Sequence, residues 1–287
     1  MSGEIAPPPD LLVEPIVRAA LIEDLGRAGD LTASACIPES AVFRADFRAR
    51  RAGRLAGLQC ARLALRLMQP DAKFEALASD GEGLQPGQVI ATVHARAHAV
   101  LAAERVALNL VQRLSGVATL TQAFVEAVAG TGVLIVDTRK TTPGLRLLEK
   151  HAVRCGGGVN HRFGLDDAIL IKDNHVAVCG GVGAALERAR QAAGWLVKIE
   201  VEVDSLAQLD EALPFRPDVV LLDNFALEDL RLAVSRVAGA TLLEASGGVT
   251  LETVRAIAET GISAISVGAL THSAPALDIG LDATQSA

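Results

Sequence analysis

The chain has 287 residues, of which half are hydrophobic, 21% charged and 3% aromatic, and its formal net charge at pH 7 is −7. This acidic composition argues against nucleic acid and anionic membranes as partners, because both attract basic surfaces. The N-terminus carries acids and prolines where a signal peptide has a basic head and an apolar core, and no apolar run reaches membrane-spanning length. The four cysteines lack paired metal-ligand spacing, which favours reduced thiols and a cytoplasmic location.

The first 115 residues predict an α+β unit of their own. Strands broken by Gly and Pro turns are expected over residues 43–58 and 81–93. Helices are expected over residues 15–25, 59–68 and 99–114. We place a linker near Ser115-Gly116, so that residues 1–115 form one domain and the tail 271–287 returns to it.

From about Val133 onward, short apolar strands alternate with helical segments. The expected strands are 133–137, 169–172, 197–203, 219–223, 242–246 and 265–268, and the expected helices are 143–155, 182–194, 205–213, 227–238 and 250–260. Ser205 and Thr250 are the predicted N-caps of two of these helices. Such alternation predicts a parallel sheet, open or closed, within a second domain of residues 116–270. Six strands are fewer than the eight of the standard α/β barrel.

Polar and glycine residues follow these strands at their carboxyl ends. They are Arg139-Lys140, Lys172, Glu202, Asp223, Ser246-Gly247-Gly248 and Gly268. Parallel α/β folds place their sites at this edge, because the loops that follow the strands converge there.

The strand candidate VKIEVEV alternates polar and apolar residues. Period-two geometry puts Lys198, Glu200 and Glu202 on one face, whereas a strand covered on both faces is expected to be nearly all apolar. The polar face therefore predicts a charged, solvated cavity. The alternative is an edge strand with one solvated face.

The stretch from Asp137 to His175 gathers cations around a glycine triplet, against the overall negative charge. These cations are Arg139, Lys140, His161, Arg162 and Lys172. Arginine forks match carboxylates and phosphates, and lysine supplies compact charge, so the cluster predicts a site for a highly anionic small molecule. A solvated charged surface is the alternative. It accounts poorly for Arg139-Lys140 and Lys172, which follow or close apolar runs.

Ser246-Gly247-Gly248, followed by a helix start, is a candidate phosphate cradle, because glycines let the backbone approach an anion and a helix start supplies free N–H donors. Gly268-Ala269 after the next strand offers a second set of donors. Glu202 and Asp223 are candidates for holding Mg²⁺, directly or through water, or for binding sugar hydroxyls. Salt bridges to Lys140 or Lys172 are the structural alternative for these two acids. The spacing of His175 and Cys179 has no further ligands beside it and is discounted as a metal site.

Several blocks of the chain, in order, resemble the quinolinate phosphoribosyltransferase family, also called nicotinate-nucleotide pyrophosphorylase (carboxylating). They are EDLGRAGDLTA, AERVALNLVQRLSGVAT, DTRKTTPGLR, AVRCGGGVNHRFGL, ILIKDNH, EVEV, LLDN, EASGGVTLETV and ISVGALTHSAPALDI. The resemblance implies an N-terminal α/β sandwich domain, an incomplete six- or seven-stranded parallel α/β barrel and a homodimer, with a hexamer left open. It implies a pentosyltransferase of NAD biosynthesis that moves phosphoribose from 5-phosphoribosyl-1-pyrophosphate (PRPP) to quinolinate with Mg²⁺. The products would be nicotinate mononucleotide, pyrophosphate and CO₂.

The resemblance also implies roles for matched residues. Quinolinate carboxylates would be held by Thr138, Arg139, His161 and Arg162, with Arg105 contributed by the opposite subunit. The catalytic residues would be Lys140, Lys172, Glu202 and Asp223. The two lysines would face substrate and pyrophosphate, and the two acids would serve the ribose and Mg²⁺. The 5′-phosphate would lie in the cradle formed by Ser246, Gly247, Gly248, Gly268, Ala269 and Leu270.

Four other functions remain as alternatives. A related family associated with molybdate transport shares the TRKT and GGG-x-x-HR patterns, but its counterpart of ILIKDNH lacks the lysine that is Lys172 here. A nicotinate phosphoribosyltransferase would prefer a monocarboxylate. A Schiff-base lyase would use Lys172 as its nucleophile. A non-catalytic metabolite-binding protein would bind both ligands without releasing pyrophosphate.

Overall fold

The computed structural model describes residues 5–284, which form two compact units. The first unit contains the described residues up to Gln122, the segment Thr141–Gly157 and the described residues from Leu270 onward. The second contains Ala123–Lys140 and Gly158–Ala269. Segment 141–157, which the expected boundary assigns to the barrel, therefore packs within the first unit.

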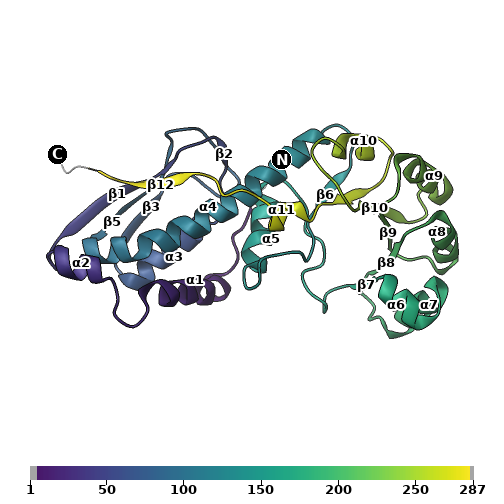
Figure 1. The fold of residues 1–287 in the computed structure, drawn as a ribbon, viewed down its shortest axis with the longest axis horizontal. Coiled ribbons are helices and arrows are strands. Elements are labelled where there is room, and N and C mark those ends of the chain that lie inside the picture. The colour runs from purple at the N-terminus through teal and green to yellow at the C-terminus, as the bar shows by residue number, and fades with distance from the viewer. Residues whose placement is uncertain (1–4, 285–287) are drawn as a thin grey trace. The chain divides into compact units, whose positions relative to one another are not determined.

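The first unit is built on an antiparallel sheet of order β12-β1-β5-β3, with a short β2-β4 pair beside it. Its elements are α1 (Asp10–Leu25), α2 (Leu31–Cys36), β1 (Val42–Ala49), β2 (Gly53–Arg54), α3 (Leu58–Met68), β3 (Lys73–Ala76), β4 (Gly83–Leu84), β5 (Val89–Arg96), α5 (Arg146–Cys155) and β12 (Ile279–Ala283). Strand β12 comes from the end of the chain and pairs with β1 from Ala45↔Ala283 to Ala49↔Ile279, as the yellow and purple-blue strands of Figure 1 show. The sheet is thus closed along one edge by the C-terminal segment.

Helix α4 (Ala97–Ala127) runs without interruption through Ser115 and Gly116, so the predicted boundary falls inside a continuous helix and not in a loop. Tertiary packing selects these small residues. A Cβ on Gly116 would overlap the carbonyl oxygen of Pro275, and the buried Ser115 Oγ accepts a hydrogen bond of 3.1 Å from the Ala56 amide. The small residues that suggested a linker are instead required by close packing around this helix.

The second unit is built on a six-stranded parallel sheet of order β6-β11-β10-β9-β8-β7. Its elements are β6 (Leu134–Val136), β7 (Ile169–Ile171), α6 (Asp173–Cys179), α7 (Val182–Ala192), β8 (Ile199–Val203), α8 (Leu206–Ala212), the 3-10 helix η1 (Leu213–Phe215), β9 (Val219–Asp223), α9 (Leu227–Val237), β10 (Leu242–Ser246), α10 (Val254–Ala258), β11 (Ala264–Ser266) and α11 (Ala269–His272), whose last residues belong to the first unit. Helices α7, α8 and α9 lie on the outer side of the sheet (Figure 1). Within the described residues β6 and β7 are the two edges and do not pair, which confirms the incomplete barrel.

Strand β8 lies between β7 and β9, so the edge-strand alternative for VKIEVEV is wrong. Parallel register places Glu202, Leu221 and Glu244 at one level on three adjacent strands. Lys198 precedes the strand and pairs with Asp218 (Nζ–Oδ1 2.8 Å), so it does not share the position of the two glutamates. The polar face of the strand is therefore shorter than predicted.

Two helix predictions need correction. Thr250 is not an N-cap, because residues 251–253 form a turn and α10 begins only at Val254, after Thr253. Helix α6 directly follows β7 and was not predicted, because its seven residues are too few to establish a helical period. Ser205 caps α8 as expected by accepting a hydrogen bond from the Gln208 amide.

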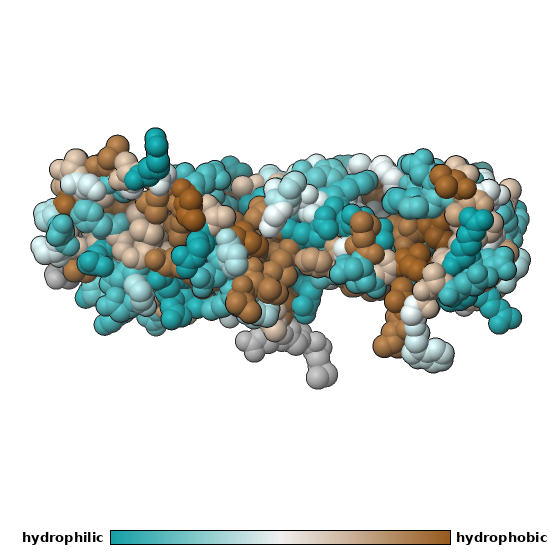
Figure 2. Space-filling view, turned by 90° about the horizontal axis from the view of Figure 1, so that it is seen from below, coloured by the Kyte–Doolittle hydropathy of each residue, from teal (hydrophilic) through white to brown (hydrophobic). Residues whose placement is uncertain are grey.

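Large apolar side chains remain exposed in both units. Figure 2 shows hydrophobic patches (brown) among hydrophilic residues (teal) on the face seen from below. The most exposed are Trp195 (98%), Val178 (88%), Leu196 (87%) and Leu11 (82%). Among residues 5–284, no helix combines the length and apolarity that crossing a membrane requires.

Candidate active site

A cavity of about 610 Å³ opens at the carboxyl edge of the parallel sheet, entirely within the second unit. Ten of the residues that line it were predicted from the sequence: Thr138, Arg139, Lys140, His161, Arg162, Lys172, Glu202, Asp223, Ser246 and Gly247. They come from the ends of β6 to β10 and from the loop after the glycine triplet. Residues predicted at separate strand ends thus line one cavity.

Two arginines supply positive charge in this cavity. The Nε atoms of Arg139 and Arg162 are both buried without a hydrogen-bond partner, although Arg162 Nη1 donates to the Ala168 carbonyl at 3.0 Å. Burial, with repulsion from Arg139, lowers the pKa of Arg162. Buried donors without acceptors are costly, so an anion that accepted from these guanidinium groups would relieve both the desolvation and the repulsion.

Opposite charges also meet at the strand ends. Lys172 Nζ donates to Glu202 Oε2 at 2.6 Å, so one of the salt bridges proposed as a structural alternative is present. The Lys172 side chain is about half exposed, which keeps its ammonium accessible to a ligand. Asp223 Oδ2 accepts from Asn224 Nδ2 at 2.8 Å. Glu202 and Asp223 thus present carboxylate oxygens from neighbouring strands to one cavity.

His161 contacts protein groups through both ring nitrogens. Nδ1 accepts a hydrogen bond from the Arg162 amide at 2.7 Å, and Nε2 lies 2.8 Å from Glu200 Oε2. This arrangement places the ring proton on Nε2, which donates to Glu200. Direct contact between a ring nitrogen and a substrate carboxylate would require His161 to exchange one of these partners.

Glu244 lies beside this pair and lines the cavity floor. It is 4% exposed, and its Oε2 is 3.9 Å from His161 Nε2. Burial, followed by the nearby charge of Glu200, raises the pKa of Glu244 to about 7. Glu244 is not among the residues predicted from the sequence, yet a lone glutamate in the apolar strand LLEAS gives the same signal that was used for Glu200.

The Ser246-Gly247-Gly248 turn has a backbone that requires glycine. Gly247 has a φ of 97° and Gly248 a φ of 59°, and a Cβ on Gly247 would overlap the side chain of Asn224. The Asn224 amide donates to the Ser246 carbonyl at 2.9 Å, so the loop after β9 supports the turn after β10. Gly248, Gly268, Ala269 and Leu270 do not line the cavity, and Leu270 belongs to the first unit.

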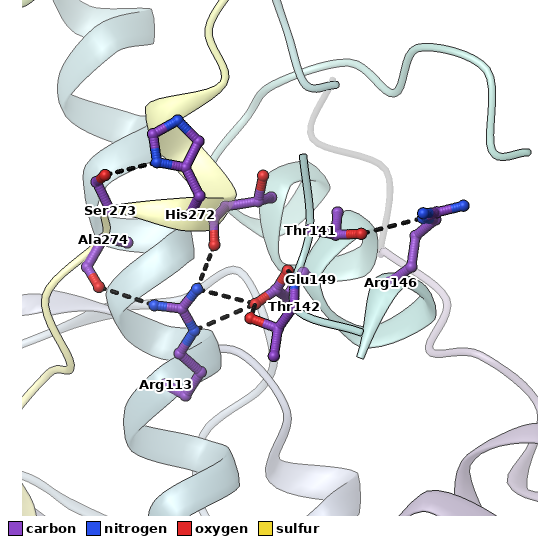
Figure 3. A network of polar contacts seen from close by, with 9 residues as sticks. Arg113, Thr141, Thr142, Arg146, Glu149, His272, Ser273 and Ala274 are labelled. Carbon is purple, nitrogen blue, oxygen red and sulfur yellow. Dashed lines mark hydrogen bonds and ion pairs between the residues drawn. The ribbon is translucent and has the colours of Figure 1, made fainter. Parts of the chain in front are cut away.

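A buried network in the first unit holds the segment that follows Arg139-Lys140 (Figure 3). The fully buried Glu149 accepts hydrogen bonds from the Thr142 amide (2.9 Å), from Thr142 Oγ1 (2.8 Å) and from Arg113 Nη2 (2.9 Å). Arg113 Nη1 also donates to the Ala274 carbonyl at 2.9 Å. Because Thr142 follows Lys140 by two residues, this network fixes the chain directly after Arg139-Lys140.

Arg105 does not line the cavity. It lies exposed on α4, in the part of the helix that belongs to the first unit. The cavity residues that the sequence analysis did not single out are Leu170, Leu221, Asn224, Glu244 and Ser266.

A second buried polar group lies within the first unit and includes no residue of the cavity. His151 Nε2 contacts Asp80 Oδ2 at 2.8 Å and Cys155 Sγ at 3.4 Å, and Asp80 also accepts from the first amides of α3. Burial raises the pKa of the Cys155 thiol. All four cysteines are free, and these contacts describe a structural network with an unreactive thiol.

An open parallel sheet with a cation-lined cavity and a glycine turn at its carboxyl edge defines an α/β protein with a site for an anionic small molecule. Residues 30–115 and 117–282 match the models of the quinolinate phosphoribosyl transferase N-terminal and C-terminal domains. The chain belongs to the quinolinate phosphoribosyl transferase family.

Individual relatives agree along nearly the whole chain. The nicotinate-nucleotide pyrophosphorylase [carboxylating] of Mycobacterium leprae is 49% identical over 271 residues, which cover 93% of this chain and 95% of the relative. A probable enzyme of the same name from Bacillus subtilis is 44% identical, covering 96% and 95%. The solved structure of the nicotinate-nucleotide pyrophosphorylase from Francisella tularensis has a TM-score of 0.93 at 37% identity, covering 99% of this chain and 100% of that one.

Proposed function

We propose that this protein transfers phosphoribose from PRPP to the ring nitrogen of quinolinate, with loss of the adjacent carboxylate, to give nicotinate mononucleotide, pyrophosphate and CO₂ for NAD biosynthesis. The observation that carries the proposal is the cavity in which two arginines with unpaired buried Nε atoms, a lysine–glutamate pair and a glycine turn converge. Quinolinate brings two carboxylates and PRPP brings several phosphate charges. A cation-rich cavity at the end of a parallel sheet suits both.

The carboxylates of quinolinate lie against Arg139 and Arg162, whose free Nε–H groups match carboxylate oxygens. Thr138 and His161 complete this wall, with His161 orienting Arg162 through its amide. Lys140 and Lys172 face the substrate and the departing pyrophosphate. The 5′-phosphate of PRPP lies at Ser246-Gly247-Gly248, a glycine turn of which Ser246 and Gly247 line the cavity. Gly268 and Ala269, which belong to the same unit as this turn, are expected to add backbone donors for the phosphate.

The carboxylates of Glu202 and Asp223 fit Mg²⁺, which prefers hard oxygen ligands and is usually bound by one or two carboxylates together with waters and substrate phosphates. When bound, Mg²⁺ would stabilise the negative charge of the pyrophosphate. Two groups of three possible metal ligands occur among the described residues: Asp80, His151 and Cys155, and His161, Glu200 and Glu244. Neither group includes Glu202 or Asp223. Two carboxylates suit an ion that arrives with PRPP better than one held by a complete protein cage.

The protein contributes mainly orientation and charge to the chemistry. Breaking the bond from C1 to pyrophosphate develops positive charge on the sugar and negative charge on the leaving group. Lys140 and Lys172 stabilise the leaving group, and carboxylates beside the ribose favour the sugar cation. The ring nitrogen attacks without a protein nucleophile, so positioning of the two substrates supplies much of the rate enhancement.

A homodimer completes the site with Arg105 from the opposite subunit, and a hexamer built from such dimers is compatible with this arrangement. Arg105 is exposed on α4 and therefore available to another chain. The exposed Trp195, Leu196 and Val178 form apolar surface that a second subunit would cover. The enzyme acts in the cytoplasm, and nucleic acid and membranes are not its partners.

The test is to incubate the purified protein with Mg²⁺, PRPP and carboxyl-labelled quinolinate, and to measure nicotinate mononucleotide and labelled CO₂. Equal amounts of both products support the proposal. Binding of both substrates without pyrophosphate release would indicate a metabolite-binding protein instead. Borohydride trapping of Lys172 on a carbonyl substrate would indicate a Schiff-base lyase.

A further inference from the structure

Three carboxylates converge beneath His161, deep in the second unit. Asp137 is 0% exposed, Glu200 7% and Glu244 4%. Glu200 and Glu244 come from β8 and β10, and Asp137 directly follows β6. Three ionised acids in so small a buried space would repel one another strongly, so the arrangement favours a proton on one of them.

The hydrogen bonds identify which acid holds that proton. The Nε2–H of His161 donates to Glu200 at 2.8 Å, which stabilises the ionised form of Glu200. Asp137 accepts from the His161 amide at 2.9 Å and from Asn160 Nδ2 at 2.6 Å, which stabilises its ionised form too. Glu244 has no such donor at Oε1, and its Oε2 lies 3.9 Å from His161 Nε2. A buried carboxyl that has only the neutral hydroxyl of Ser266 as a donor, and that lies beside another carboxylate, is most stable as the neutral acid.

A neutral carboxylic acid is also a proton donor, and Glu244 lines the cavity. The strand neighbours of Glu244 are Leu221 on β9 and Ala264 on β11, and Ser266 lines the same cavity. The titratable groups that act on Glu244 are Glu200, His161 and Asp137. The cavity therefore contains one buried acid whose raised pKa favours its neutral form, among arginines, lysines and other carboxylates.

The proposed reaction needs such a proton at one step. After the ring nitrogen is ribosylated, the bond between C2 and its carboxylate breaks, CO₂ leaves, and the electron pair remains on C2. That carbanion must gain a proton to become the C2–H of nicotinate mononucleotide.

We propose that Glu244 is the catalytic acid that delivers this proton, an inference that rests on the proposed function. The Glu244 O–H bond breaks as the C2–H bond forms, and Glu244 becomes a carboxylate that regains a proton from solvent between turnovers. Repulsion from Glu200 restores the neutral acid. The same burial that raises the pKa of Glu244 to about 7 keeps a large fraction of it protonated at neutral pH.

The test compares the steady-state kinetics of the wild type with Glu244→Gln, which keeps the size of the side chain and removes the acid. We expect kcat to fall about 100-fold while KM for quinolinate and for PRPP changes by less than about threefold. In the wild type, kcat falls as the pH rises above about 7, because the acid loses its proton. This basic limb is absent in Glu244→Gln and present in Glu244→Asp, which retains a carboxylic acid and recovers part of the activity.

A matched control is Glu149→Gln, which alters another fully buried glutamate in the other unit. This variant is expected to lower the melting temperature and to leave the basic limb in place. Turnover by the wild type establishes the proposed function whatever Glu244→Gln does, so the two proposals fail separately.

Three results would overturn the assignment of Glu244. The first is a Glu244→Gln variant whose kcat stays within about threefold of wild type with an unchanged pH profile. The second is a kcat loss accompanied by higher KM values and a retained basic limb, which would indicate a structural role. The third is stoichiometric metal held by His161, Glu200 and Glu244 in the purified protein, because metal ligation needs both carboxylates ionised.

Discussion

The substitution Gly247→Ala tests the phosphate turn most sharply. Gly247 has a φ of 97°, and an added Cβ would lie 2.6 Å from Asn224 Cγ and 3.1 Å from the Asn224 amide nitrogen. Alanine at such a φ costs about 1–3 kcal/mol. Moving the Asn224 side chain also breaks its 2.8 Å hydrogen bond to Asp223, which is worth about 1 kcal/mol.

Together these terms come to about 3 kcal/mol, or about a 100-fold loss of affinity for a ligand that requires the native turn. We expect KM for PRPP to rise by about this factor, with a much smaller change in KM for quinolinate. Initial rates measured against each substrate, with the other saturating, separate the two effects.

Gly248→Ala is the matched control for this turn. Its φ of 59° lies in the left-handed region, but an added Cβ meets nothing within 4 Å. The cost is therefore about 1 kcal/mol of backbone strain, or about fivefold in KM for PRPP. An equal rise of KM for PRPP in both variants, or an unchanged KM for PRPP in Gly247→Ala, would refute the role given to this turn.

Lys172→Ala removes the ammonium that bonds to Glu202, and we expect kcat to fall about 100-fold or more; turnover close to wild type would contradict its place at the leaving group. Glu149→Ala leaves Arg113 and the Thr142 amide without their acceptor, so unfolding of the first unit becomes about 3 kcal/mol easier, which calorimetry would detect. The raised pKa of Glu244 favours the folded state fully below about pH 4.5, and this contribution is lost as the pH rises through about 7. Thermal melts between pH 5 and pH 8 are therefore expected to show the wild type losing up to about 3 kcal/mol relative to Glu244→Gln, whereas parallel curves would exclude a buried neutral acid.

Much of the fold could be predicted because strand ends carry strong local signals. Strands β9 (Val219–Asp223) and β10 (Leu242–Ser246) have the predicted bounds, since each is a short apolar run closed by a polar residue. Convergence of the residues after these strands follows from parallel topology, so most cavity residues were predictable too.

The errors arose where distant parts of the chain decide the local structure. Gly116 resembles a linker residue in the sequence, but contact with Pro275 places it inside a helix. The alternation of the strand places Lys198 on the same face as Glu200 and Glu202, but Lys198 pairs with Asp218 on the neighbouring chain segment. The raised pKa of Glu244 depends on burial and on Glu200, a partner 44 positions away that no local pattern reveals.

The most direct test of the central claim is the ratio of kcat/KM for quinolinate to that for nicotinate, measured with PRPP and Mg²⁺. The claim is that the guanidinium groups of Arg139 and Arg162, whose Nε atoms are buried and unpaired, neutralise two carboxylates beside the activated sugar. A monocarboxylate leaves buried donors unpaired, so we predict a preference for quinolinate of about 10⁴-fold. Equal use of the two substrates, or a preference for nicotinate, would contradict the account.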